Sequence, residues 1–140
     1  MPRAARIERD FYSLIGEQNA NGKYVCVGLD TDPDVLASLT AKGLPLGVRK
    51  RATMAEKMLA FNRHVIDATA DVAAAYKPNA AFYRRLGPMG SWALKETIGY
   101  AHTRAPRAVV IEDAKIADIG STNKHYAMEV FDGHGADAVT

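Results

Sequence analysis

The sequence is poor in cysteine and has no long apolar run, and both absences narrow the class of protein. Cys26 is the single cysteine of the 140 residues, so a disulfide framework within the chain is excluded and a reducing compartment is expected. No segment reaches the roughly 18 continuous apolar residues of a membrane span. Arg3, Arg6 and Arg9 precede no apolar core of the kind found in a secretory signal. We therefore expect a cytoplasmic protein without a membrane partner.

The sequence also lacks a large excess of charge of one sign. Lysine and arginine total 18 against 16 aspartate and glutamate residues, and the two signs are interspersed along most of the chain. Nucleic-acid binding requires a clustered basic face, whereas the densest basic run, residues 49–51, is typical of a solvated helix entrance. The composition, 48% hydrophobic and 24% charged, is that of an ordinary globular protein. We expect one domain, in which Cys26 is a small buried hydrophobic residue.

Short β-rich runs alternate with segments of helical periodicity. The run over residues 24–29 predicts a buried strand. Three further strands are predicted: one that ends near Lys77, one over residues 108–111, and one from residue 136 onward. Residues 33–51 are expected to be irregular or weakly helical. Helices are predicted around residues 7–16, 58–72, 88–101 and 121–131, the last with Ser121 as its N-cap. The predicted apolar faces of the first three helices are Ile7, Phe11, Leu14 and Ile15; Met58, Phe61, Val65, Ala68 and Val72; and Trp92, Leu94, Ile98 and Ala101.

This alternation of strand and helix predicts an α/β fold with a parallel sheet. Two architectures fit, a doubly wound sheet and a TIM (β/α)8 barrel. A doubly wound nucleotide-binding sheet would carry a G-x-G-x-x-G turn after its first strand, and residues 28–32 read Gly-Leu-Asp-Thr-Asp instead. The sequence therefore favours a TIM barrel, of which this chain supplies about the first four βα units.

Charged residues follow the predicted strands at their C-terminal ends. Asp30 ends the first strand, Lys77 the second, and Asp113, Lys115 and Asp118 form a D-x-K-x-x-D motif after the third. A TIM barrel places its active site at this end of the strands. A lysine flanked by carboxylates keeps its proton, which suits proton donation or the stabilisation of a carbanion. A carboxylate beside it repels an anionic group on a substrate, as a decarboxylation without cofactor requires. The alternative interpretation of the motif alone is a surface salt bridge at a strand end.

Four segments of the sequence resemble a known family. Residues 27–33 (VGLDTDP), 61–67 (FNRHVID), 75–83 (AYKPNAAFY) and 113–122 (DAKIADIGST) are similar, in order and spacing, to the orotidine 5′-monophosphate decarboxylases, in particular to their longer bacterial form. The resemblance covers the chain from about Phe11 to Thr140. Many members of the longer form carry Arg-Gly where this chain has Ile116-Ala117. The shorter form has apolar residues there, so we do not expect activity to depend on this difference.

The resemblance implies a role for each charged residue. Lys115 would be the general acid that protonates carbon 6 of the pyrimidine, and Asp113 would press on the substrate carboxylate and hold Lys115. Asp118 would complete the charge network from the partner subunit of a homodimer. Asp30 and Lys77 would bind ribose hydroxyls, and Thr122 would do so across the dimer interface. The substrate would be the nucleotide orotidine 5′-monophosphate, and the family uses no metal and no organic cofactor.

Two alternatives stay open. The first is a metal-dependent relative, such as a hexulose-phosphate synthase or a keto-gulonate-phosphate decarboxylase, which shares D-x-K-x-x-D but would carry a metal-binding acidic residue after the second strand. Residues 77–79 are Lys-Pro-Asn here. The second is a non-catalytic half-barrel that serves assembly, because a barrel needs eight strands and typically about 250 residues. On either view we expect residues 1–140 to be the N-terminal half of a single barrel domain.

Overall fold

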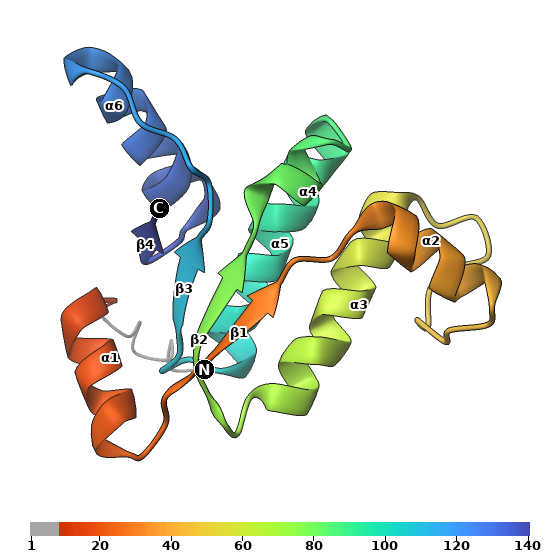
Figure 1. Cartoon of the computed structure of the whole chain (residues 1–140), viewed down its shortest axis with the longest axis horizontal. Helices are drawn as coiled ribbons and strands as arrows, with labels where there is room; N and C mark the ends of the chain where they lie inside the picture. The colour runs from red at the N-terminus through yellow and green to blue at the C-terminus, as the bar shows by residue number, and fades with distance from the viewer. Residues whose placement is uncertain (1–8) are drawn as a thin grey trace, which may run out of the picture.

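The computed structural model describes residues 9–140, and within them four strands alternate with helices (Figure 1). The strands are β1 (Val25–Leu29), β2 (Ala73–Pro78), β3 (Val109–Glu112) and β4 (Ala138–Val139). The helices are α1 (Phe11–Ala20), α2 (Pro33–Ala41), α3 (Met54–Thr69), α4 (Ala80–Arg84), α5 (Pro88–Arg104), α6 (Gly120–Ala127) and the π-helix η1 (Met128–His134). This order confirms the predicted α/β alternation. The predicted helix position Ile7 lies outside the described residues.

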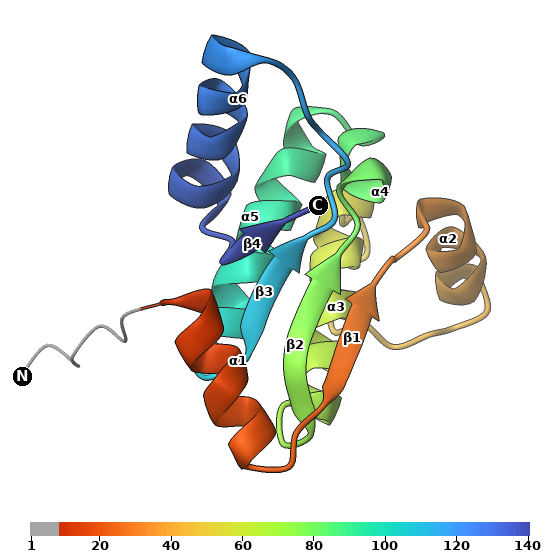
Figure 2. The same ribbon diagram turned by 60° about the vertical axis from the view of Figure 1, so that its left-hand side comes forward.

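The strands form one parallel sheet in the order β1-β2-β3-β4 (Figure 2). A doubly wound sheet reverses its strand order at a switch point, whereas a barrel adds each new strand beside the last. The sequential order therefore identifies the described chain as part of a TIM barrel with about four βα units, as the sequence predicts. No helix within residues 9–140 is long and apolar enough to span a membrane.

The two faces of the sheet have different neighbours. Tyr76 of β2 donates a hydrogen bond to the Ile66 carbonyl of α3, so the odd-numbered neighbours Ala75 and Lys77 point to the opposite face. On that opposite face Ala75 packs with Val109 and with Leu14 of α1. Helices α3 and α5 thus cover one face and α1 covers the other (Figure 2). The α1 face carries Lys77 at the C-terminal end of β2.

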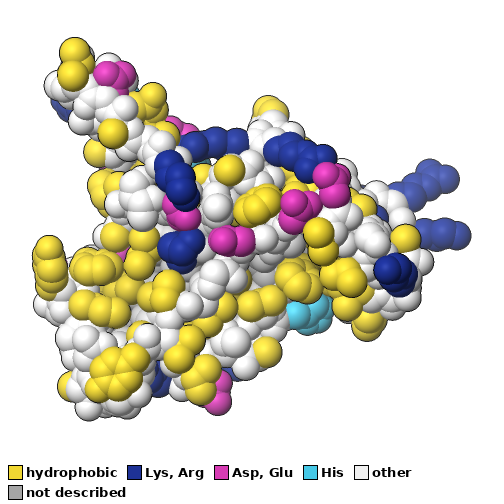
Figure 3. Space-filling model, viewed as in Figure 1, with side chains coloured by type: hydrophobic (Ala, Val, Ile, Leu, Met, Phe, Trp, Pro, Cys, Tyr) yellow, Lys and Arg dark blue, Asp and Glu magenta, His cyan; other side chains and the backbone are white. Residues whose placement is uncertain are grey.

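The main core lies between the sheet and the helices α3 and α5. It contains large side chains that are almost completely buried: Leu29, Leu36, Met58, Ile66, Tyr76, Tyr83, Leu94, Ile98, Val110 and Val130. Gly90 in the first turn of α5 brings this helix against α4, because a Cβ there would lie 1.7 Å from the carbonyl oxygen of Tyr83. Large apolar side chains are exposed on α1 and at the start of β1, namely Tyr12, Tyr24 and Val25. Hydrophobic atoms spread over this part of the surface (Figure 3).

Asp137, just before β4, connects the beginning of the described chain to the sheet. Its carboxylate accepts hydrogen bonds from Arg9 Nε at 2.7 Å and from the backbone N–H of Val110 at 2.8 Å, and it lies 3.3 Å from His102 Nε2. Burial alone would raise the pKa of Asp137, but these donors lower it to about 2. Arg9 also donates to the carbonyl of Ala108. The cluster therefore holds the segment before α1, helix α5, β3 and the start of β4 together at the N-terminal end of the strands.

The apolar face predicted for the second helix is partly wrong. The buried residues of α3 are Ala55, Met58, Leu59, Asn62 and Ile66, whereas Ala68 is exposed and Val72 lies beyond the helix, 49% exposed. The buried face is therefore rotated relative to the predicted one, and the polar Asn62 lies at its centre. A reading by hydrophobicity passes over an amide and shifts the predicted stripe to the half-buried Phe61 and Val65.

Three further expectations are corrected by the structure. Residues 33–41 form the regular helix α2, since the Asp32 side chain caps it and Pro33 opens its first turn. Cys26 and Val25 are exposed rather than buried, because β1 pairs with β2 alone and forms an edge of the described sheet. Ser121 does not cap the last helix, which begins at Gly120 with Ile119 as its N-cap.

Candidate active site

The C-terminal end of β3 places a carboxylate at the centre of a charged cluster. Asp113 lies in register with Asn79 through an isolated parallel bridge, and its backbone N–H donates to the carbonyl of Pro78 at 2.9 Å. Its backbone carbonyl accepts from the N–H of Ala80 at 3.0 Å. Both sides of the peptide are therefore held by β2 and the start of α4, and the Asp113 side chain is only 10% exposed. The position of this carboxylate is set by the sheet.

Both oxygens of Asp113 are used. Lys77 Nζ donates to Oδ2 at 2.9 Å, Lys115 Nζ donates to Oδ1, and Thr140 Oγ1 donates to Oδ1 at 2.9 Å. Lys77 Nζ also lies 3.9 Å from Oδ1 of Asp30. The structure thus brings together Asp30, Lys77, Asp113 and Lys115, which the sequence predicts as neighbours at one edge of the sheet.

This cluster has a clear electrostatic character. The hydrogen bonds from Lys115 and then Lys77 hold the pKa of Asp113 well below its usual range, so its carboxylate is ionised at neutral pH. The hydrogen bond to Asp113 raises the pKa of Lys77, so its ammonium group is charged. Asp113 is therefore a fixed negative charge beside two amines, one of which, Lys115, has a side chain 69% exposed to the open end of the sheet.

Lys115 reaches Asp113 by a different route from the one expected. The sequence suggests that both residues lie on a strand and point to one side, two positions apart. In the structure β3 ends at Glu112, and Lys115 has a φ of 51°, in the left-handed region that non-glycine residues seldom adopt. Arg84 donates to the carbonyl of Ala114 at 3.1 Å and so fixes the turn. A backbone strained at this point is typical of a functional site.

Asp118 and Thr122 lie apart from the cluster. Asp118 is exposed, and within the described chain its side chain accepts only from the backbone N–H of Ile119, at 2.7 Å. Thr122 is half-buried in the first turn of α6. Neither forms a hydrogen bond or ion pair with Asp113, Lys115 or Lys77 in residues 9–140.

Sequence reasoning missed Thr140 as a member of this cluster. Thr140 follows β4 as Asp113 follows β3, so the rule that drew attention to the other strand ends also applies to it. Asn79 was not assigned a role either, and its side chain caps α4 by accepting from the N–H of Ala81 at 3.1 Å. Among residues 9–140, no group of three or more His, Cys, Asp or Glu side chains is placed to hold a metal ion.

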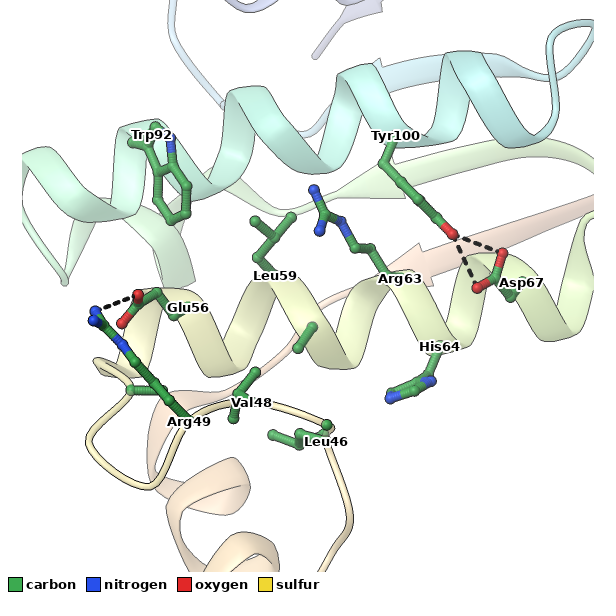
Figure 4. Close-up of a pocket in the computed structure, with 13 residues that line it drawn as sticks. Leu46, Val48, Arg49, Glu56, Leu59, Arg63, His64, Asp67, Trp92 and Tyr100 are labelled. Atoms are coloured by element: carbon green, nitrogen blue, oxygen red, sulfur yellow. Dashed lines mark hydrogen bonds and ion pairs between the residues drawn. The ribbon is translucent and has the colours of Figure 1, made fainter.

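A hollow separate from the charged cluster lies on the helical side of the sheet, between α3, α5 and the segment after α2. It has a volume of about 610 Å³, and Trp92, Tyr100, His64 and Arg63 line it (Figure 4). The acidic groups in it already have partners: Asp67 accepts from Tyr100 Oη at 2.9 Å, and Glu56 pairs with Arg49 at 2.7 Å. None of the residues predicted for catalysis lies in this hollow.

Comparisons with known proteins point to one family. A sequence profile of the Orotidine 5′-phosphate decarboxylase / HUMPS family matches residues 23–140. An orotidine 5′-phosphate decarboxylase of Parabacteroides distasonis is 42% identical over 117 residues, which cover 84% of this chain and 38% of that protein. One of Natronomonas pharaonis is 44% identical over 132 residues, covering 93% of this chain and 43% of that protein.

A solved structure leads to the same family. The OMP decarboxylase of Leishmania donovani superposes with a TM-score of 0.73 at 32% identity, and the match covers 93% of this chain and 43% of that one. The chain thus spans about two fifths of the length of the relatives it matches.

Proposed function

Because the chain belongs to the orotidine 5′-phosphate decarboxylase / HUMPS family, we propose that it carries the catalytic lysine and carboxylates of an orotidine 5′-monophosphate decarboxylase. The observation that supports this most directly is the ionised Asp113 between Lys77 and Lys115 at the C-terminal end of a parallel sheet. Two proteins named orotidine 5′-phosphate decarboxylase are 42% and 40% identical to this chain, and each match covers 84% of the chain.

The geometry suggests how the reaction proceeds. The Asp113 carboxylate stays ionised and would face the carboxylate on carbon 6 of the bound pyrimidine, which raises the energy of the substrate relative to the transition state. As the carbon–carbon bond breaks, CO2 leaves and the electron pair remains on carbon 6. The ammonium group of Lys115 stabilises this carbanion and donates a proton to carbon 6, giving uridine 5′-monophosphate. The neutral lysine then regains a proton from water.

Asp30 and Lys77 are proposed to hold the sugar. Their side chains lie 3.9 Å apart at the ends of neighbouring strands and so present a carboxylate and an ammonium group side by side. Such a pair can accept from one hydroxyl of a ribose and donate to the next. Lys77 would thereby link the sugar to the Asp113 carboxylate.

Asp118 and Thr122 are proposed to act across a homodimer. Asp118 is exposed in a segment that also exposes apolar side chains: Ile119 is 82%, Met128 49% and Phe131 43% exposed. Large exposed apolar side chains on one segment favour a protein interface there. A second copy seated there would cover these side chains and bring its Asp118 towards the Lys115 of the first.

The chain is proposed to supply the first four βα units of one barrel domain. The matched relatives are more than twice as long as the matched region, which covers 38% of the Parabacteroides distasonis protein. In TIM barrels the phosphate site usually lies in the loops after the seventh and eighth strands. The groups that bind the phosphate and the pyrimidine would then belong to the rest of the barrel.

The test is the loss of orotidine 5′-monophosphate absorbance on adding the protein in its full natural length, with and without EDTA. We expect turnover that EDTA does not reduce. A folded dimer without turnover would contradict the proposal. Magnesium-dependent activity on a sugar phosphate would favour the metal-dependent branch of the family instead. Against that branch, the residue after β2 is Asn79, whose side-chain oxygen caps α4, rather than an acidic metal ligand.

A further inference from the structure

Asn62, in the middle of α3, is a completely buried amide whose hydrogen bonds extend in two directions. Its Oδ1 accepts from Thr31 Oγ1 at 2.5 Å, and its Nδ2 donates to Tyr83 Oη at 2.8 Å and to Thr97 Oγ1 at a longer 3.4 Å. All four side chains are buried, with exposed fractions between 0% and 9%. The amide therefore connects three elements besides its own: the segment after β1, α4 and α5.

Two of these connections lead to the candidate active site. Thr31 directly follows Asp30 at the end of β1, and Tyr83 belongs to α4, which begins three residues after Lys77. The Asp30 and Lys77 side chains lie 3.9 Å apart, and no hydrogen bond joins them directly in the described chain. The pairing of Gly28 with Lys77 and of Leu29 with Pro78 aligns the two strands up to their ends. Beyond these pairs the sheet no longer holds the two segments to each other, and there Asn62 bonds to both.

The network is suited to hold one arrangement. A buried amide that loses a partner costs about 1–3 kcal/mol, so the segments cannot shift freely without a penalty. Burial also raises the pKa of Tyr83 well above its ordinary value, so its hydroxyl accepts from Asn62 in the neutral form and places no charge in the core. An apolar side chain of the same size would fill the space without fixing a direction.

We propose that Asn62 is a positioning residue for sugar recognition: it sets the segments after β1 and β2 so that Asp30 and Lys77 meet the ribose hydroxyls of the nucleotide together. This inference rests on the proposed function. Asn62 does not touch substrate, and it acts through Thr31 and Tyr83.

The chain offers a matched pair of variants to test it. Thr31→Val and Thr97→Val each remove one buried hydroxyl that bonds Asn62, with little change in side-chain size. Only Thr31 lies beside a proposed substrate-binding residue. A purely structural network would therefore respond to both variants in the same way, by a lower melting temperature. Changing Asn62 itself would leave three hydroxyls unsatisfied and endanger folding.

The measurement uses the full-length protein and two ligands, uridine 5′-monophosphate and its 2′,3′-dideoxy analogue, with dissociation constants from calorimetry. The dissociation constant of the dideoxy analogue divided by that of uridine 5′-monophosphate reports recognition of the hydroxyls alone. We expect Thr31→Val to reduce this ratio about tenfold and Thr97→Val to leave it within about twofold, although both lower the melting temperature. Thr31→Ser, which keeps the hydroxyl, should restore the wild-type ratio.

The outcomes separate this inference from the proposed function. If the wild-type protein converts orotidine 5′-monophosphate but Thr31→Val keeps the wild-type ratio, or Thr97→Val reduces it equally, the positioning role is overturned and the decarboxylase proposal stands. If the wild-type protein neither turns over that substrate nor prefers the hydroxylated nucleotide, the proposed function fails and the positioning role fails with it.

Discussion

At the scale of single residues, the candidate site is organised around the two carboxylate oxygens of Asp113. Lys77, Lys115 and Thr140 all donate to this carboxylate. Of the two lysines Lys115 is the more accessible, since its side chain is 69% exposed while that of Lys77 is 32% exposed. A proton donor must leave its resting partner and reach the substrate. Under the proposed mechanism Lys115 would therefore move to the reacting carbon, and Lys77 would remain with the carboxylate.

Removing the Lys115 amine should abolish turnover and preserve the fold. We expect Lys115→Ala to lower kcat at least about 10³-fold, because both proton donation and carbanion stabilisation are lost. The melting temperature should stay nearly unchanged, since Asp113 keeps Lys77 and Thr140 as donors. Turnover of orotidine 5′-monophosphate and thermal unfolding measure the two effects. Lys95→Ala, which removes an exposed lysine of α5, is the control and should remain active; an active Lys115→Ala protein would refute the assignment.

The sequence alone identifies Asp30, Lys77, Asp113 and Lys115 as neighbours because one rule applies to all of them: parallel strands end at the same edge of a sheet. It does not reveal the left-handed turn at Lys115, because a φ of 51° at a lysine follows from contacts made by residues distant in sequence. It also hides Asn62, whose polar side chain interrupts an apolar face. Buried polar groups escape a reading based on hydrophobicity whenever their partners are distant in sequence.

At the scale of elements, the contact between α4 and α5 depends on the absence of one side chain. A Cβ at position 90 would lie 1.7 Å from the carbonyl oxygen of Tyr83, which is backbone and cannot rotate away. The same α4 segment carries Tyr83, one of the partners of Asn62. The spacing of α4 and α5 therefore also determines where the residues after β2 lie.

Gly90→Ala should destabilise the fold strongly. We expect a loss of about 3 kcal/mol or more in the free energy of unfolding, because the added methyl group forces α5 away from α4. Gly99→Ala is the matched control on the same helix. A Cβ at position 99 meets nothing within 4 Å, so this change should stabilise by about 0.5–1 kcal/mol through helix propensity. Urea unfolding of both variants measures the difference, and equal effects would show that the close approach is relaxed in solution.

A buried acid–base pair holds η1 against the sheet. His134 Nδ1 lies 2.8 Å from Oε2 of Glu112, whose side chain is completely buried on the helical face of β3. The hydrogen bond that His134 donates to this carboxylate raises the pKa of His134 above its ordinary value of 6.5. Glu129 adds to the increase, whereas burial and Arg84 oppose it. The charged form of His134 is therefore favoured in the folded protein.

The stability of the fold should accordingly decrease at alkaline pH. A raised folded-state pKa gives stabilisation that is complete below about 6.5 and is lost as the pH rises through the folded value. We expect the free energy of unfolding to fall as the pH rises from about 6.5 into the alkaline range, and the protection of the η1 amide protons against exchange to fall with it. In His134→Gln this dependence should flatten. A wild-type protein whose η1 protection stays constant across that range would show that the pair contributes no linkage.

The sequence predicts the ends of helices and strands best where a start or stop residue coincides with the packing of the folded chain. The strand ending near Lys77 and the helix opened by Pro88 are confirmed. The sequence analysis does not predict a regular helix after Pro33, although Asp32 and Pro33 form a strong start signal. Only Pro33 and Leu36 of this helix become buried, whereas Val35 and Leu39 are exposed, so its apolar residues do not form one buried stripe. The cap at Ser121 was wrong because α6 buries no side chain in the described chain, so its start is set by the preceding turn.

At the scale of the whole molecule, the described sheet has two free edges. β1 pairs with β2 alone and β4 with β3 alone, and Val25 and Val139 are 51% and 38% exposed. A closed barrel has no such edges, because its first and last strands pair. Within the charged cluster at the strand ends, the side chains of Lys115 and Asp30 are 69% and 46% exposed to water. Water around these groups weakens the electrostatic interaction of Lys115 and Asp113 with any substrate.

These edges lead to a prediction for residues 1–140 expressed alone. Although this segment contains Asp113, Lys115 and Asp118, we expect its decarboxylase activity to be at least about 10³-fold below that of the full-length protein. Binding energy from the non-reacting phosphate contributes to catalysis, and each roughly 1.4 kcal/mol lost is a factor of ten in rate. Turnover of orotidine 5′-monophosphate by the segment alone, and after co-expression with the rest of the barrel as a separate polypeptide, measures this. We expect activity only in the second case, because strand pairing then excludes water from Lys115 and restores the phosphate loops. Full activity from the segment alone would mean that the phosphate is bound by residues 9–140 themselves, and that the open strand ends provide a sufficiently shielded site.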